Sequence, residues 1–283
     1  MPIPVSCEFF PPKSEAGAEK LRLVYQTLAE TIQPEYFSVT FGAGGSTQSR
    51  TFETVREIQQ NASVPAAPHL SCIGSTRDGI AAILEDYRAQ DIRRIVALRG
   101  DLPSGMQDPG DFRYANELVA FIREHSGDWF HIEVAAYPEF HPQAPSAQVD
   151  LDNFERKVNA GADAAITQYF FTIDAYTRFM EDCDKRGINI PIVPGIMPIT
   201  NYQQLARFSD SCGADIPRWL RKRLESYGDD LDSLRAFGHE VITDLCERLV
   251  ANGAPAIHFY AMNRAEPVIH LCQDAGLITN TQP

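Results

Sequence analysis

One glutamate stands inside an apolar segment near the start of the chain. Glu8 lies within residues 5–10 (VSCEFF), and two prolines end this segment. Burial penalises the charged form of a carboxylate and raises its pKa. A carboxyl group that keeps its proton near neutral pH can act as a general acid. We therefore expect a raised pKa and a catalytic role for Glu8. The alternative is a glutamate at a strand edge whose carboxylate reaches solvent.

Polar residues also follow other apolar runs. They are Ser38 and Thr40 with the string 42–45 (GAGG), His69, the string 99–101 (RGD), Tyr137, Glu139, His141, Gln168, Asn263 and Arg264. Each alone has a structural explanation, such as an ion pair for Arg99 and Asp101 or a helix N-cap for Asn263. The string 42–45 lacks the spacing of a dinucleotide fingerprint. If the runs are parallel strands of one barrel, these residues meet at its carboxyl rim, where barrel enzymes carry their active sites.

The elements that would position these residues alternate regularly. Expected strands are 5–10, 36–41, 66–70, 94–98, 132–137, 165–170, 190–196 and 256–262, and they are apolar on both faces, as buried parallel strands require. Expected helices are 18–30, 48–60, 77–89, 114–125, 150–160, 173–186, a long stretch over 201–251 with an extra short helix within 209–231, and 264–275. This alternation predicts an α/β fold, a single-domain (β/α)8 TIM barrel over 1–283. A doubly wound open sheet is the alternative.

Composition limits the possible classes of protein. The 283 residues are 44% hydrophobic and 22% charged, which is typical of a globular protein. The net charge of -13 argues against nucleic-acid binding, because phosphates would be repelled. The sequence has no apolar run long enough for a membrane span and no secretory signal, so we expect a cytoplasmic protein. The six cysteines are scattered, which favours reduced thiols over disulfides or a zinc site.

Several catalytic chemistries have no matching motif. None of the five lysines ends an expected strand in an apolar setting, so a Schiff-base aldolase is not indicated. The patterns H-x-H, H-E-x-x-H and G-x-S-x-G do not occur, and we expect no metal. Acidic residues at a barrel mouth without lysine, metal or serine chemistry favour an organic cofactor.

Seven strings resemble those of the methylenetetrahydrofolate reductases. They are 7–12 (CEFFPP), 38–45 (SVTFGAGG), 97–103 (ALRGDLP), 135–139 (AAYPE), 165–171 (AITQYFF), 193–198 (VPGIMP) and 258–264 (HFYAMNR), in family order and over essentially the whole chain. The length resembles that of the bacterial form, which consists of the catalytic barrel alone. The resemblance implies non-covalent FAD, NADH or NADPH as reductant, and reduction of 5,10-methylenetetrahydrofolate to 5-methyltetrahydrofolate by ping-pong hydride transfer. It also implies a homo-oligomer.

The resemblance assigns roles to individual residues. FAD contacts carry over to Thr40, Phe41, Ala43, His69, Arg99, Gly100, Asp101, Tyr114, Ala115, Tyr137, His141, Ala144, Asp150, Asn153, Arg156 and Lys157. Folate contacts carry over to Glu8, Gln168, Gln204, Phe208 and Arg264, and the catalytic residues to Glu8 and Asp101. Phe41 stands where family members often have tyrosine, so we expect it only to pack. Two alternatives remain open: another FAD-dependent barrel dehydrogenase, similar to proline dehydrogenase, and a flavin-binding barrel without catalysis.

Overall fold

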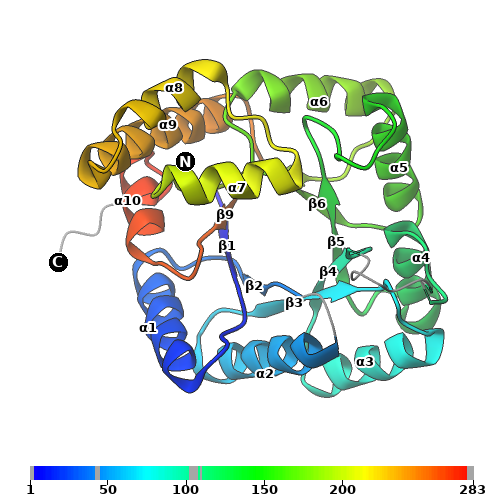
Figure 1. The fold of residues 1–283 in the computed structure, drawn as a ribbon. Helices are drawn as coiled ribbons and strands as arrows, with labels where there is room; N and C mark the ends of the chain where they lie inside the picture. Colours follow the sequence, from blue (N-terminus) through cyan, green and yellow to red (C-terminus); the bar gives the residue numbers. More distant parts are fainter. Residues whose placement is uncertain (1–2, 42–44, 102–107, 109, 279–283) are drawn as a thin grey trace.

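The strands of the protein form a central ring that helices surround (Figure 1). The computed structural model describes residues 3–41, 45–101, 108 and 110–278. The strands are β1 (Val5–Phe9), β2 (Phe37–Val39), β3 (Ala66–Ser71), β4 (Arg94–Leu98), β5 (His131–Ala136), β6 (Ala164–Thr167), β7 (Ile192–Val193), β8 (Gly195–Ile196) and β9 (Ile257–Tyr260). The helices are α1 (Glu15–Thr31), α2 (Gly45–Asn61), α3 (Arg77–Ala89), α4 (Ala115–Ser126), α5 (Ala147–Asn159), α6 (Ile173–Lys185), α7 (Tyr202–Cys212), α8 (Arg218–Ser226), α9 (Leu231–Ala251) and α10 (Glu266–Asp274).

All strand pairs in the described residues are parallel, and their order is β7-β6-β5-β4-β3-β2-β1-β9-β8. The chain therefore forms a nearly closed barrel, as the alternating pattern predicted. The seventh expected strand is divided into β7 and β8, because Pro194 between them has no N–H to donate. Its carbonyl oxygen accepts a hydrogen bond from His258 N at 3.0 Å. The strand thus leaves β6 and joins β9, which brings the two ends of the sheet together.

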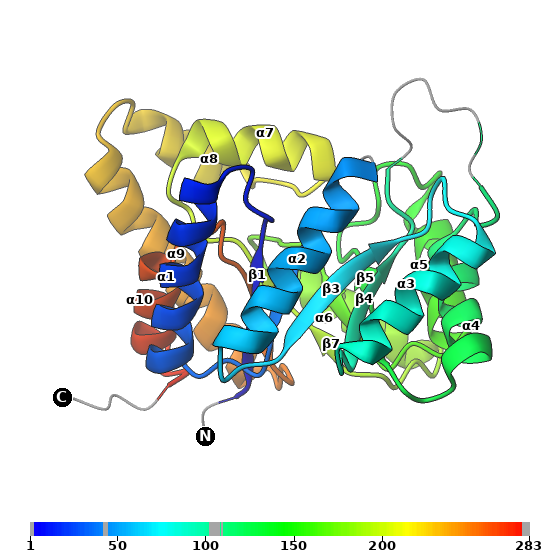
Figure 2. The same ribbon diagram turned by 90° about the horizontal axis from the view of Figure 1, so that it is seen from below.

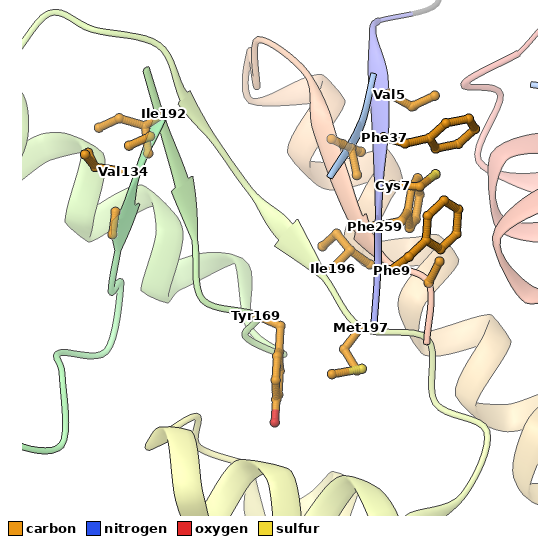
Figure 3. Close-up of a cluster of buried hydrophobic side chains, with 14 of the residues drawn as sticks. Val5, Cys7, Phe9, Phe37, Val134, Tyr169, Ile192, Ile196, Met197 and Phe259 are labelled. Carbon is orange, nitrogen blue, oxygen red and sulfur yellow. The ribbon is translucent and has the colours of Figure 1, made fainter. Parts of the chain in front are cut away.

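Side chains of β1 alternate between two environments. Val5, Cys7 and Phe9 lie with Phe37 and Phe259 in a buried apolar cluster on one side of the strand (Figure 3). The rings of Phe9 and Phe37 are 5.1 Å apart between centroids. The intervening residues of β1 point the other way, into the barrel. This period of two decides which residues can belong to the site.

The long helical stretch after β8 consists of three helices. Asn201 caps α7, since its side chain accepts a hydrogen bond from Gln204 N at 2.9 Å. Gly213 ends the helix with a φ of 77°. The extra short helix that the sequence predicted is α8. In Figure 2, α7 lies at the end of the barrel toward which the carboxyl ends of the strands point. No described helix combines the length and the apolar character that crossing a bilayer would require.

Candidate active site

Glu8 faces the barrel interior between two histidines. Its Oε2 is 3.2 Å from His69 Nε2 on β3 and 3.6 Å from His258 Nε2 on β9. The Glu8 side chain is 11% exposed. Among the described residues, neither Nε2 atom has a hydrogen-bond partner of suitable geometry. Two buried imidazole nitrogens are therefore available for a proton or a ligand beside one carboxylate.

The expected raised pKa of Glu8 is wrong for the structure described here. Burial raises the pKa, as the apolar strand suggested, but the charges of His69 and His258 outweigh burial and lower the pKa to about 2. Both histidines come from other strands, so the local sequence around Glu8 gave no sign of them. The Glu8 carboxyl group on its own therefore does not keep a proton near neutral pH in this state.

His258 is a site residue that the sequence analysis did not select. Its Nδ1 lies 2.7 Å from Ser6 Oγ, which fixes the orientation of the ring. The register of β1 and β9 pairs Ser6 with His258 and Glu8 with Tyr260. A signal existed: both strands alternate polar and apolar residues, and the polar ones must share the inner face. The alternation is hidden when each run is interpreted as apolar on both faces.

A second cluster surrounds a cavity of about 530 Å³ beyond the ends of β4 and β5. The predicted FAD contacts that line it are Arg99, Tyr114, Ala115, Tyr137, His141, Ala144, Asp150, Asn153, Arg156 and Lys157. These residues come from two strand ends, two helices and the loops between them. The structure therefore brings ten of the expected contacts around one cavity, and its volume lies in the usual range for a small-molecule site.

Hydrogen bonds hold the wall of this cavity. Asp150 Oδ2 accepts from His141 N at 3.0 Å, and Arg99 Nη2 donates to Gln143 Oε1 at 2.6 Å. The Tyr137 and His141 rings meet edge to face with centroids 4.6 Å apart. Burial lowers the pKa of His141, which favours the neutral imidazole.

Two cations stand on α5 at the same cavity. Lys157 Nζ donates to the carbonyl oxygen of Ala135 at 2.5 Å, and burial lowers its pKa to about 8. Arg156 is exposed, and its Nη1 donates to Asn153 Oδ1 at 2.7 Å. A partly desolvated lysine beside an exposed arginine suits an anionic group such as a phosphate, which would restore the lysine charge.

Gly100 permits a close backbone approach at the end of β4. Its φ is 82°, and a Cβ there would lie 1.8 Å from Ser71 Oγ. Ser71 Oγ itself donates to the carbonyl oxygen of Arg99 at 2.9 Å. Asp101 follows as an exposed residue and contributes to raising the pKa of Tyr137, whose main cause is burial. Asp101 therefore lies on the same rim as the cavity.

Tyr260 lies between the two clusters. Its hydroxyl donates to the carbonyl oxygen of Thr167 at 2.7 Å. Burial raises its pKa well above the ordinary value, and nearby Glu8 and Tyr137 act in the same direction. The glutamate–histidine group and the rim of the cavity are thus parts of one mouth.

The other predicted residues are placed more loosely. The carbonyl oxygen of Thr40 accepts from Thr51 Oγ1 at 2.9 Å, Phe41 is half-buried, and Ala43 lies outside the described residues. Gln168 follows β6, and its Oε1 accepts from the backbone N–H of Tyr169 at 3.1 Å. On α7, Gln204 is exposed and Phe208 packs partly buried against the core.

Asn263 does not cap a helix, as had been one expectation; Ala265 is the N-cap of α10. Instead, Asn263 Oδ1 accepts from Phe10 N at 2.8 Å, and its Nδ2 donates to Phe10 O at 3.0 Å. Arg264 comes next and lines a separate cavity of about 390 Å³ beside α9 and α10. The structure therefore does not bring Arg264 into the cavity of the predicted FAD contacts.

Within the described ranges, no group of three or more His, Cys, Asp or Glu side chains could hold a metal ion. All six cysteines are free thiols.

The barrel, its polar mouth and the adjoining cavity define an enzyme of the α/β-barrel class. A family model described as methylenetetrahydrofolate reductase matches residues 2–276. The 5,10-methylenetetrahydrofolate reductase of Salmonella typhimurium is 41% identical over 275 residues, covering 97% of this chain and 91% of the relative. The protein of the same name from Escherichia coli is 40% identical with the same coverage. The chain belongs to the methylenetetrahydrofolate reductase family, and is an oxidoreductase of folate one-carbon metabolism.

Two further comparisons place the chain more widely. A protein of Arabidopsis thaliana named methylenetetrahydrofolate reductase (NADH) 1 is 37% identical over 292 residues, covering 98% of this chain and 49% of that relative. A solved structure from Clostridium thermocellum, described as binding two copies of 5-methyl-5,6,7,8-tetrahydrofolic acid, has a TM-score of 0.64 at 16% identity. It covers 98% of this chain and 95% of its own, and it confirms the fold.

Proposed function

We propose that the protein uses FAD and NADH or NADPH to reduce 5,10-methylenetetrahydrofolate to 5-methyltetrahydrofolate. The observation that carries the cofactor is the 530 Å³ cavity, because ten residues expected to contact FAD line it together. The names of the relatives support the folate substrate. The neighbour described with bound 5-methyltetrahydrofolic acid is consistent with a folate in a barrel of this shape.

The residues around the cavity suit FAD. Lys157 and Arg156 would meet the diphosphate, and Asp150 and Asn153 the ribose. Gly100 has no side chain, so its backbone can lie close to Ser71 of β3 and leave this part of the rim open. When bound, FAD would supply hydride transfer in two separate steps, from the nicotinamide and then to the folate.

The folate step also needs a proton, because the five-membered ring of the substrate opens only when its departing nitrogen is protonated. We assign this proton to Glu8 acting with its two histidines. A proton held by His69 or His258 passes to the carboxylate 3.2 or 3.6 Å away, and Glu8 delivers it to the folate nitrogen. In this proposal the two histidines store the proton, whereas the sequence suggested that Glu8 itself would be protonated before the folate binds.

The remaining rim residues have roles in this proposal. Asp101 would stabilise the cationic form of the opened folate by its charge. Gln168 would hydrogen-bond the substrate at the end of β6. Phe208 would stack on it from α7, with Gln204 exposed one turn away. Arg264 would bind an anionic part of the folate away from the FAD cavity.

The visible spectrum of the purified protein tests the cofactor. We expect a bound flavin that loses its colour under anaerobic conditions with NADH or NADPH and regains it with 5,10-methylenetetrahydrofolate. Comparing the two nucleotides at equal concentration shows which is preferred. Turnover with proline but not with the folate would instead support the dehydrogenase alternative. A flavin that binds but is not bleached would support the non-catalytic alternative, and a colourless folded protein would overturn the FAD assignment.

The expected homo-oligomer is tested by light scattering.

A further inference from the structure

The interior of this barrel is unusually polar. Branched apolar side chains dominate most (β/α)8 interiors, but here Ser6, Glu133 and His258 are buried among the strands. Tyr36, just before β2, is buried with them. These four residues stand near the amino ends or in the first half of their strands, so they lie below Glu8 in the barrel.

The upper part of this group reaches the active site. His258 Nε2 is 3.6 Å from Glu8 Oε2, and its Nδ1 is 2.7 Å from Ser6 Oγ. One imidazole therefore faces the carboxylate with one nitrogen and a serine hydroxyl with the other. An imidazole can accept a proton on one nitrogen and release another from its second nitrogen.

The lower part reaches the opposite end of the barrel. The Tyr36 hydroxyl donates to Glu133 Oε2 at 2.7 Å, and Arg94 Nη1 donates to Glu133 Oε1 at 2.6 Å. Arg94 is 21% exposed in its side chain and also pairs with Glu35, which is 49% exposed. The carboxylate of Glu133 is itself only 2% exposed, yet it touches groups that reach the solvent.

Ser6 joins the two parts. The Tyr36 ring stacks on the His258 ring with centroids 6.2 Å apart, so it lies against the imidazole that Ser6 contacts at 2.7 Å. No direct hydrogen bond links these two hydroxyls among the contacts of the described residues, so one of them has to turn before a proton can pass.

We propose that Glu133, Tyr36, Ser6 and His258 form a path, the base path, that conducts protons from the amino end of the barrel to Glu8. The inference rests on the proposed function, in which each folate reduced consumes one proton. Glu8 is 11% exposed, and in that function the bound ligands cover the mouth above it. A supply of protons from the amino end of the barrel returns Glu8 to its protonated form while ligands occupy the mouth.

The transfers balance. Glu133 takes one proton from solvent, each hydroxyl gives up its own proton as it accepts another, and His258 passes one from Nε2 to Glu8. That proton replaces the one given to the folate nitrogen. The transfer leaves the other His258 nitrogen, Nδ1, protonated, so the hydroxyls and the imidazole ring must turn before the next proton can pass. No bond other than O–H and N–H forms or breaks along the path.

Tyr36→Phe interrupts the path and keeps the ring. In a single turnover, mixing reduced enzyme with folate, the first proton is already on the glutamate–histidine group, so the rate should match the wild type. In steady state the rate should fall by about 10²-fold, the lower end of the range that proton transfer by a positioned side chain contributes, and the solvent deuterium isotope effect should increase. Ferricyanide as electron acceptor needs no folate proton, so NAD(P)H oxidation with it should be unchanged.

Tyr176→Phe is the matched control, because Tyr176 is also buried and its hydroxyl donates to Ile192 O at 2.8 Å, away from the path. Steady-state rates of the two variants that do not differ would overturn the base path. So would an equal loss in single and multiple turnovers of Tyr36→Phe, since that result indicates a structural role. Lack of flavin or of folate turnover in the wild type defeats the proposed function instead.

A second measurement is independent of turnover. Glu133→Gln in the protein without ligands should shift the ring ¹⁵N resonances of His258, assigned from the His258→Gln spectrum, because the path transmits a change at one end to the other. The His239 resonances serve as the internal reference, since that ring pairs with Asp274 outside the barrel interior. Unchanged His258 resonances would contradict the base path.

Discussion

Lys157 should make the stability of the protein without FAD depend on pH in an unusual direction. Burial lowers its pKa from 10.5 to about 8. Between these values the unfolded chain keeps the proton that the folded protein has lost, so the contribution of Lys157 to stability rises with pH. The difference corresponds to up to about 3 kcal/mol, since each pKa unit is worth about 1.4 kcal/mol. Below pH 8 the folded protein bears the full penalty of a desolvated ammonium group.

The assay compares urea unfolding of wild type and Lys157→Met at several pH values from 7 to above 10. The hydrogen bond to Ala135 O is lost at every pH, and buried tyrosines and cysteines titrate in both proteins, so these effects cancel in the pH dependence of the difference. Lys185→Met is the control, because the hydrogen bond to Asp182 raises the pKa of Lys185 and reverses the direction. A difference between wild type and Lys157→Met that stays flat across this range refutes the reasoning. In the proposed function, FAD should also bind the wild type less tightly above pH 8, and the variant with little pH dependence.

Three further substitutions test the mouth. Glu8→Gln should leave flavin bleaching by NAD(P)H intact and slow the folate step on the order of 10²–10⁴-fold, as stopped-flow absorbance of each half-reaction would show; equal losses in both would remove the acid role. Asp101→Asn should raise the flavin reduction potential and slow the folate step, and an unshifted redox titration would dismiss the electrostatic role. Gly100→Ala should lower the free energy of unfolding by about 1–3 kcal/mol more than Gly127→Ala does, as thermal unfolding would show. Both glycines have positive φ, but only at Gly100 would the added Cβ meet Ser71 Oγ. Similar losses in the two variants would mean that the contact with Ser71 relaxes freely.

The sequence predicted the barrel well because its expected strands alternate with helical segments along the chain. Apolar runs and helical segments follow one another, and a parallel sheet with helices outside is the arrangement that buries both. Pro194 was visible inside the seventh run, yet its effect depends on which neighbour each half joins. β7 pairs with β6 and β8 pairs with β9, and the residues of the run alone do not indicate these partners.

The cavity for the predicted cofactor contacts was also within reach, since those residues are near one another along two successive strand ends. The charge state of Glu8 was not. It depends on His69 and His258, which are distant in sequence and meet the carboxylate only when the ring closes. Burial was inferred correctly from the neighbours of Glu8, but the larger opposing effect came from other strands.

The pairing of β1 with β9, and of Phe10 with Asn263, places the seam of the ring between segments separated by 253 residues. While the chain is being synthesised, β1 and β2 leave the ribosome long before β9, so the outer edge of β1 has no native neighbour for most of translation. Ring closure must therefore wait until β9 has been synthesised, and a nascent chain stalled before residue 257 would remain a target for chaperones and proteases.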